Sequence, residues 1–298
     1  MTSLELQYDR VGMENTPLDV AEETSRAIWR SFPLHKRAAV LVLVLPSPGN
    51  ESSNKHSGGS GFSTLLTTRA HTLKTSPGLA AFPGGKADSL DEDEWQCALR
   101  EAAEEIGFDP SKAPGFRQLG TMPCYLSYND IAVRACVAAI DGLTTPALQP
   151  NVTAAAAAAE DELAAQRLGA LLAPTVQADE VNFVFLLPLE RVLETGGWYA
   201  GGTPMPVRGH GWIFHDYVIP VNEVVVVARA AVPAGAAATR TRSRAATIIL
   251  QGLTGHIVSD VARLVLDTPP EMEVLAYIGS NRIAREYYQK KYDWKMPL

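Results

Sequence analysis

The segment from Asp91 to Gly107 constrains the fold more than any other part of this 298-residue chain. Its apolar residues recur at helical spacing, and a glycine stands where a helix commonly ends. At about 100° of rotation per residue, Glu101, Glu104 and Glu105 share one arc of about 100°. The apolar side chains lie opposite them, namely Trp95, Leu99, Ala102, Ala103 and Ile106. The spacing therefore predicts a helix over 91–107 that buries one face and displays three anions on the other.

The two ends of this helix carry further signals. Ser89 and Glu92 have the spacing of a capping box, and the acidic residues at 91–94 suit a positive helix N-terminus. Three neighbouring carboxylates repel one another, and their oxygens suit a hard cation such as Mg²⁺ or Mn²⁺. Arg100 lies one turn before Glu104 and is expected to pair with it. Taken alone, the carboxylates are equally consistent with a solvated acidic face.

The residues before the helix extend the pattern. The turn FPGG at 82–85 is followed by REAAEEIG at 100–107, and the combination closely resembles the signature of the Nudix hydrolases. Five residues separate Gly85 from Asp91, whereas seven separate Glu92 from Arg100. The signature needs one acidic residue at this place, and the spacing leaves both Asp91 and Glu92 open.

A second motif, at 65–85, resembles the coenzyme A diphosphatase branch of that family. It reads LLTTRAHTLKTSPGLAAFPGG, and stretches 180–189 and 251–254 are similar to the same branch. The chain departs from it at Ser76, Ala80 and Gln251, where many members carry histidine, valine and tryptophan. The resemblance covers about residues 36–266.

The resemblance implies an α/β fold, with a mixed β-sheet in an α/β/α sandwich. The sheet is expected between the helix at 91–107 and a helix near 249–266, the latter within a helical stretch at 246–266 broken near Gly252. The expected organisation is an N-terminal extension at 1–35 with a short helix at 19–31, a Nudix domain at 36–266 and a tail at 267–298, with low-complexity insertions at about 150–174 and 233–246. Strands are expected at 38–45, 61–69, 79–85, 118–122, 131–140, 181–188, 212–219 and 223–227.

The activity implied by the resemblance is metal-dependent hydrolysis of a diphosphate in coenzyme A or acyl-CoA, giving 3′,5′-ADP and a phosphopantetheine. Mg²⁺ or Mn²⁺ would be bound by Glu101, Glu104 and Glu105, with Arg100 orienting Glu104. The expected catalytic residues are Glu104, Arg100 and Glu180, the last as a base from outside the helix. Expected substrate contacts are Arg69 and Lys74 at the 3′-phosphoadenosine end and Gly84 and Gly85 at the diphosphate.

Each assignment has a simpler alternative. Glu180 would then be a solvated strand residue, Arg69 and Lys74 ordinary surface bases, and the glycine pair only a turn. For the whole chain, the alternatives are hydrolysis of another nucleotide, such as an oxidised nucleoside triphosphate or a dinucleotide, and a catalytically silent Nudix-like binding module. The presence of Glu101, Glu104 and Glu105 argues against the silent module.

Composition limits which partners the protein can bind and in which compartment it is expected. The chain has 26 basic and 33 acidic residues, a net charge of −7, which argues against nucleic acid as a partner. No apolar run reaches the length of a membrane span. Three cysteines without a CxxC pair indicate a reducing, intracellular and cytoplasmic location. The resemblance also allows a peroxisome, although the terminal residues 296–298 are not a Ser-Lys-Leu address. The expected partner is a small nucleotide, and the oligomeric state stays open.

Overall fold

The computed structural model describes residues 18–48, 60–113, 115–140, 166–172, 176–207, 210–230, 247–266 and 268–272. The sequence predictions for 1–17, for 233–246, for most of the insertion at 150–174 and for most of the tail lie outside the described residues.

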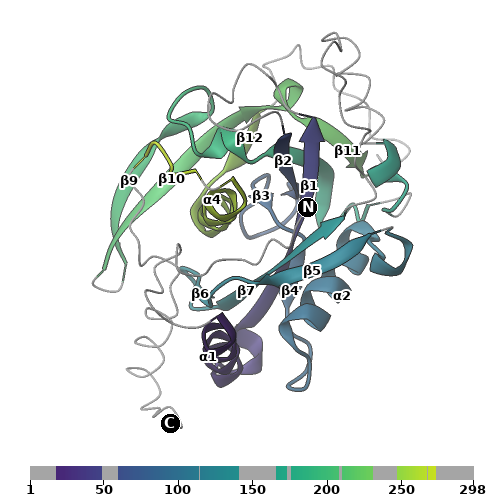
Figure 1. Ribbon diagram of the computed structural model, residues 1–298, viewed down its shortest axis with the longest axis vertical. Helices are drawn as coiled ribbons and strands as arrows, with labels where there is room; N and C mark the ends of the chain where they lie inside the picture. The colour runs from purple at the N-terminus through teal and green to yellow at the C-terminus, as the bar shows by residue number, and fades with distance from the viewer. Residues whose placement is uncertain are drawn as a thin grey trace.

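A mixed sheet of nine strands forms the centre of the described part (Figure 1). Its main path runs β11-β8-β2-β1-β7-β5, while β3, β4 and β6 pair with β2, β1 and β7 respectively. The strands are β1 (Arg37–Pro48), β2 (Ser60–Arg69), β3 (Ala80–Ala81), β4 (Gly84–Lys86), β5 (Phe116–Thr121), β6 (Tyr125–Leu126), β7 (Ala132–Ile140), β8 (Val181–Pro188) and β11 (Val225–Arg229). The central pair β1 and β7 is parallel, and the other pairs are antiparallel.

The strand β1 shows why this sheet has two buried faces. Successive side chains of a strand point to opposite sides. Leu41 and Leu43 therefore join one core, and Val42 and Val44 join the other. A continuous apolar run such as AAVLVLVL at 38–45 suits a strand covered on both sides.

Helices cover both faces, as Figure 1 shows. On one side lie α1 (Leu18–Ser31) and α2 (Glu94–Ile106), and on the other lies α4 (Gly252–Leu266). A second sheet of β9 (Tyr199–Val207), β10 (His210–Pro220) and β12 (Thr247–Leu250) packs on α4. Single 3₁₀ turns lie at Leu34–Lys36, Pro110–Lys112, Glu190–Val192 and Val221–Glu223. Among the described helices, none is both long and apolar enough to cross a membrane.

The helix α1 belongs to the same core as α2, although its residues fall in the predicted N-terminal extension. Ile28, Trp29 and Phe32 are buried with the apolar face of α2. The indole Nε1 of Trp29 donates a hydrogen bond of 2.9 Å to the carbonyl of Ala38 in β1. Burial of such side chains contributes about 1.5–3 kcal/mol each, so α1 adds substantially to the stability of the fold.

The secondary structure differs from the prediction in three places. The single strand expected at 79–85 is divided into β3, which pairs with β2, and β4, which pairs with β1. Residues 247–250 form strand β12 instead of the start of a helix, and α4 begins only at Gly252. Ile248 pairs with Ile219 of β10 and is buried there, so tertiary pairing outweighs the local pattern. The strand β9 was not predicted, because its Gly- and Pro-rich residues lack an apolar alternation and its pairing with β10 sets its conformation.

Candidate active site

The helix α2 begins at Glu94, with Asp93 as its N-cap. The backbone N–H of Gln96 donates to Asp93 Oδ1 at 2.8 Å, and the N–H of Asp93 donates to Gln96 Oε1 at 3.0 Å. The capping box predicted at Ser89 was therefore wrong, and the box lies four residues further along. The predicted C-terminal stop at Gly107 is confirmed by its left-handed backbone conformation.

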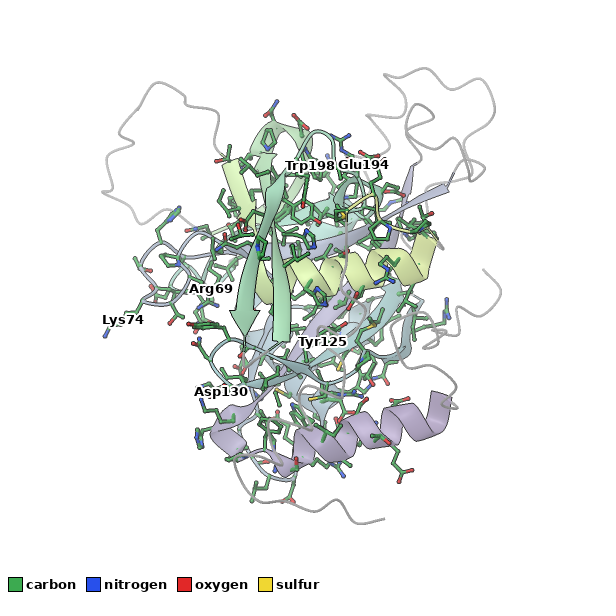
Figure 2. The ribbon with its side chains drawn as sticks, turned by 90° about the vertical axis from the view of Figure 1, so that its left-hand side faces the viewer. Arg69, Lys74, Tyr125, Asp130, Glu194 and Trp198 are labelled. Carbon is green, nitrogen blue, oxygen red and sulfur yellow. The ribbon has the colours of Figure 1, made fainter. Side chains whose placement is uncertain are left out.

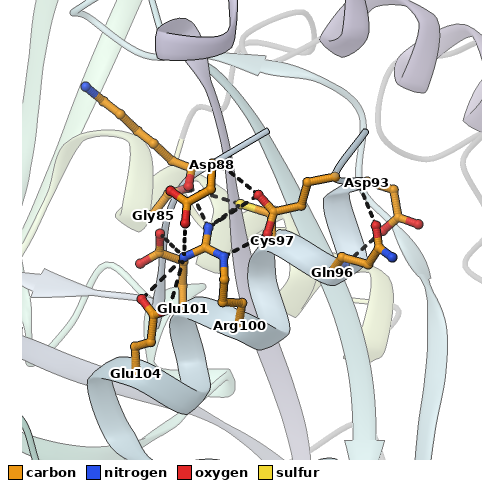
Figure 3. Close-up of polar contacts among 10 residues, drawn as sticks. Gly85, Asp88, Asp93, Gln96, Cys97, Arg100, Glu101 and Glu104 are labelled. Atoms are coloured by element: carbon orange, nitrogen blue, oxygen red, sulfur yellow. Dashed lines mark hydrogen bonds and ion pairs between the residues drawn. The ribbon is translucent and has the colours of Figure 1, made fainter. Parts of the chain in front are cut away.

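Arg100 connects α2 to the loop that precedes it (Figure 3). Its Nε donates to Glu92 Oε1 at 2.8 Å, and one terminal amino group donates to the carbonyl of Lys86 at 2.8 Å. The other terminal amino group lies 3.1 Å from a carboxylate oxygen of Glu101 and 3.3 Å from one of Glu104. The expected pair with Glu104 is thus present, and Arg100 also holds the loop at 86–92 against the helix.

Of the two acidic residues that the spacing left open, Glu92 makes the contact with Arg100. Its second oxygen accepts the backbone N–H of Asp88 at 2.7 Å. Burial opposes ionisation of Glu92, but the hydrogen bonds from Arg100 and Asp88 outweigh it and lower the pKa of this carboxyl. Asp91 is exposed. The carboxylate of Asp88 lies 3.5 Å from Arg100, a contact that sequence reasoning missed because no local spacing indicates it.

Gly84 and Gly85 bring the backbone of β4 directly beneath two of the helix carboxylates. The N–H of Gly84 donates to Glu105 Oε2 at 3.1 Å. A Cβ atom on Gly85 would lie 2.4 Å from the carboxyl carbon of Glu101. A Cβ atom on Gly84 would lie 2.4 Å from the carbonyl oxygen of Ala39, and Gly84 has a φ of +153°. Gly84 is therefore required by the neighbouring strand, and Gly85 leaves the space that the carboxylate of Glu101 occupies.

Glu105 is the most perturbed acid of this region. It is buried, and burial is the largest cause that raises its pKa. The negative charges of Glu101 and Glu180 also raise this pKa, while the Gly84 N–H and the charge of Arg69 lower it, and the combined effect is a pKa of about 8. The fold thus brings together charged groups from α2, from the end of β2 and from the residue before β8.

The turn at 177–180 explains how Glu180 reaches α2. The N–H of Gln177 donates to the backbone carbonyl of Glu105 at 3.1 Å, and the N–H of Glu180 donates to Gln177 at 3.0 Å. The carbonyl of Glu180 accepts the N–H of Ala70 at 2.8 Å. Glu180 is therefore held between the C-terminal end of α2 and the end of β2, immediately before β8 as predicted.

The two expected phosphate-binding residues lie in different surroundings. Arg69 ends β2, and its Nε donates to the carbonyl of Thr75 at 3.2 Å, which closes the loop at 70–79. Its charge acts on Glu105. Lys74 is exposed and extends from the outer edge of this loop, away from Arg69 (Figure 2). The structure brings Arg69 to the acidic residues and does not bring Lys74 there.

The donor set suits a hard cation, although no ready-made cluster is present. Carboxylate oxygens are the ligands that Mg²⁺ and Mn²⁺ prefer, and a cation would relieve the repulsion around the buried Glu105. In the described part of the chain, no three acidic, histidine or cysteine side chains converge as a metal-binding group. Instead, the Arg100 guanidinium pairs with Glu101 and with Glu104, whose side chain is 55% exposed.

Comparison with known proteins gives consistent matches. The family model for the NUDIX domain matches residues 36–187. Peroxisomal coenzyme A diphosphatase NUDT7 of Mus musculus is 27% identical over 210 residues, which cover 70% of this chain and 66% of that protein. The Nudix hydrolase NudL of Cronobacter sakazakii is 31% identical over 222 residues, covering 69% of this chain and 90% of that protein.

A third relative shares a shorter region. Peroxisomal coenzyme A diphosphatase 1 of Saccharomyces cerevisiae is 33% identical over 122 residues, which cover 38% of this chain and 32% of that protein. The chain thus spans about two thirds of the mouse protein and about a third of the yeast protein. A family match over half of the chain, and a bacterial relative covered over most of its length, show that the chain belongs to the Nudix hydrolases, enzymes that act on diphosphate bonds.

Proposed function

We propose that this chain is a Mg²⁺- or Mn²⁺-dependent diphosphatase that hydrolyses coenzyme A or acyl-CoA to 3′,5′-ADP and a phosphopantetheine. The observation that carries the proposal is the contact of the glycine turn of β4 with Glu101 and Glu105. Arg69 and Glu180 lie beside this place, at the paired ends of β2 and β8. Two relatives that bear the name coenzyme A diphosphatase support the choice of substrate.

The metal would be held by Glu101, Glu104 and Glu105, and when bound it neutralises phosphate charge and acidifies a water molecule. Arg100 orients Glu101 and Glu104 through its ion pairs with both. The glycine pair lets the backbone of β4 lie against Glu101 and against β1, because a side chain at either residue would clash with the Glu101 carboxylate or with Ala39.

Glu180 is the proposed general base. The water oxygen forms a bond to one phosphorus atom, the bond from that phosphorus to the bridging oxygen breaks, and the other phosphate leaves with the electron pair. The proton of the water passes to the carboxylate of Glu180. The turn at 177–180 holds Glu180 at the C-terminal end of α2, where its negative charge raises the pKa of Glu105.

Arg69 is the proposed contact for the 3′-phosphate of coenzyme A. Its Nε is used by Thr75, which leaves the two terminal amino groups, unpaired within the described part of the chain, for a ligand. A guanidinium offers a charge-assisted, two-pronged contact to phosphate. Lys74 was expected to share this role, but its position at the outer edge of the loop gives it a smaller part.

A substrate panel with product identification by mass spectrometry tests the proposal. A charge-assisted hydrogen bond contributes about 1.5–3 kcal/mol, or roughly ten- to hundred-fold in kcat/KM. Coenzyme A should therefore be cleaved at least about tenfold more efficiently than 3′-dephospho-coenzyme A. Arg69→Ala should remove most of this preference and spare the dephosphorylated substrate, whereas Lys74→Ala should change it little.

Equal cleavage of both substrates by the unaltered enzyme would show that the enzyme does not recognise the 3′-phosphate, and would contradict this part of the proposal. Preferred cleavage of an oxidised nucleoside triphosphate or a dinucleotide would move the substrate to the general nucleotide class. Binding without any cleavage would favour the silent binding module.

We further propose an intracellular location, in the cytoplasm or in a peroxisome. All three cysteines, Cys97, Cys124 and Cys136, are buried, and none of them forms a disulfide bond. Cysteines without disulfides agree with a reducing compartment.

A further inference from the structure

A buried ionic network lies beneath the first turn of α2, at the end opposite the proposed metal ligands. Glu94 and Arg134 are both fully buried, and one carboxylate oxygen of Glu94 lies 3.5 Å from a terminal nitrogen of Arg134. The same oxygen accepts the Nε–H of Arg26 at 2.9 Å. Arg26 belongs to α1, Glu94 to α2 and Arg134 to β7, so one carboxylate joins three elements.

Further contacts keep this network in one arrangement. Arg134 donates to the carbonyl of Met122 at 2.6 Å and to the hydroxyl of Thr121, which itself donates to Glu22 of α1 at 3.2 Å. The thiol of Cys136 donates to the backbone carbonyl of Glu94 at 3.3 Å. The start of α2 is thus attached both to the sheet and to α1.

Stability alone does not explain why this network is ionic. The second carboxylate oxygen of Glu94 and the Nε of Arg134 are buried and have no hydrogen-bond partner within the described residues. A buried ion pair must offset a large desolvation cost, and apolar replacements of similar volume are often as stable or more stable. A role in fixing geometry accounts for charges that burial alone would not favour.

We infer that Arg26 and Arg134 are positioning residues for α2, acting through Glu94. The inference rests on the proposed function, because the placement of α2 matters for the reaction only if the carboxylates at 101–105 bind the metal. Glu101 comes seven positions after Glu94, which at 1.5 Å per residue is about 10 Å along a rigid helix. A shift at the first turn is therefore transmitted to the proposed metal ligands.

Arg26 is the residue through which the network can be tested without unfolding the chain. Its side chain is 39% exposed, whereas Arg134 is fully buried, and its replacement would remove a buried cation from Glu94 and disrupt the core around it. Arg26→Met keeps the aliphatic stem and leaves the Glu94–Arg134 pair intact. The docking of α1 through Ile28, Trp29 and Phe32 is not touched.

The matched control is Arg30→Met, which makes the same chemical change on the same helix at an exposed position. Hydrogen exchange of the full-length chain is measured first, because it needs neither metal nor substrate. Arg26→Met should raise the exchange rates of amides 98–106 about threefold or more, while Arg30→Met should leave them unchanged. Unchanged exchange in Arg26→Met would overturn the inference.

Two further measurements separate positioning from simple stability. Titration with Mn²⁺ alone should show binding weakened about tenfold in Arg26→Met. With Mg²⁺ and coenzyme A, kcat should fall about tenfold while KM stays within about twofold, and Arg26→Lys should recover part of the loss. A lower Tm with unaltered Mn²⁺ affinity and kcat would show a purely structural network and contradict the inference.

The same set of measurements distinguishes a failure of the proposed function. If the unaltered chain binds Mn²⁺ but does not cleave coenzyme A, the substrate assignment fails, and the Mn²⁺ and exchange data still decide the role of Arg26. If Glu104→Gln binds Mn²⁺ as tightly as the unaltered chain, the ligand assignment fails independently of Arg26.

Discussion

Replacing Gly85 with alanine should disable the site while leaving the fold intact. The added Cβ would lie 2.4 Å from both the carboxyl carbon and one oxygen of Glu101, whereas ordinary contacts begin near 3.4 Å. The carboxylate must therefore move by about 1 Å (3.4 − 2.4). A displacement of this size commonly costs about a hundredfold in rate, or about 2.7 kcal/mol in activation free energy.

Stability should change little in Gly85→Ala, for two reasons. The atoms that clash belong to the far end of a flexible side chain, so they can rotate away without moving backbone. The loss of chain entropy on folding is also smaller for alanine than for glycine, which stabilises by about 0.4–1 kcal/mol where the backbone conformation is compatible. By contrast, Gly84→Ala should disrupt the pairing of β4 with β1, because its Cβ would clash with the backbone of Ala39.

The assay is steady-state hydrolysis of coenzyme A with Mg²⁺, together with thermal unfolding of the same preparation. The matched control is Gly196→Ala, since a Cβ at that exposed glycine meets no atom within 4 Å. Near-normal kcat/KM in Gly85→Ala would refute the reasoning, because the carboxylate of Glu101 would then not be needed where the structure places it. A collapse of Tm would show that the clash involves more than this side chain.

Three further predictions concern other acids. Glu104→Gln should lower turnover by several orders of magnitude with little change in Tm, since its exposed side chain is a proposed ligand and not part of the core; near-normal turnover with Mg²⁺ would remove it from the ligand set. Glu180→Gln should reduce kcat more than KM, because a base acts in the transition state, and unchanged kinetics would return this residue to a solvated role. Burial of Glu94 favours the neutral acid, but the charges of Arg134 and Arg26 outweigh it and lower the pKa of that carboxyl. Its contribution to stability should be complete above the ordinary Glu pKa of about 4.3 and be lost as pH falls through the lower folded value. Glu94→Gln should therefore be less stable at pH 7, and Tm measured from pH 7 to pH 3 should converge with that of the unaltered chain; a constant difference would contradict this.

Local pattern was sufficient for the helix that carries the proposed ligands. The spacing of apolar residues and the stop at Gly107 predicted α2 to within three residues, and the apolar run at 38–45 predicted β1. Both signals depend on neighbours along the chain, so no tertiary information was needed. The start of α2 was predicted wrongly, because the capping box was placed at Ser89, whereas Asp93 is the N-cap and Glu92 pairs with Arg100 instead.

Strand pairing was the weakest part of the sequence interpretation. Residues 247–250 fit a helix or a strand equally well by composition, and only the register against β10 decides between them. The same holds for β9, whose glycines and prolines give no apolar alternation. In both cases the deciding contacts come from residues far away in the chain.

The sequence by itself determined the family, the presence of an acidic helix and the three carboxylates that share one arc of it, because a helix has a fixed rotation per residue and its motif is contiguous. The burial of Glu105 within that arc was decided by the tertiary structure. Only the tertiary structure decided which distant groups meet that arc. Glu180 and Arg69 lie at the paired ends of β8 and β2, where their charges act on Glu105, whereas Lys74 lies at the outer edge of its loop. The attachment of α1 to α2 through Arg26 and Glu94 was equally invisible in the sequence, since an ion pair across 68 residues depends on how two helices pack on one sheet and on no local spacing.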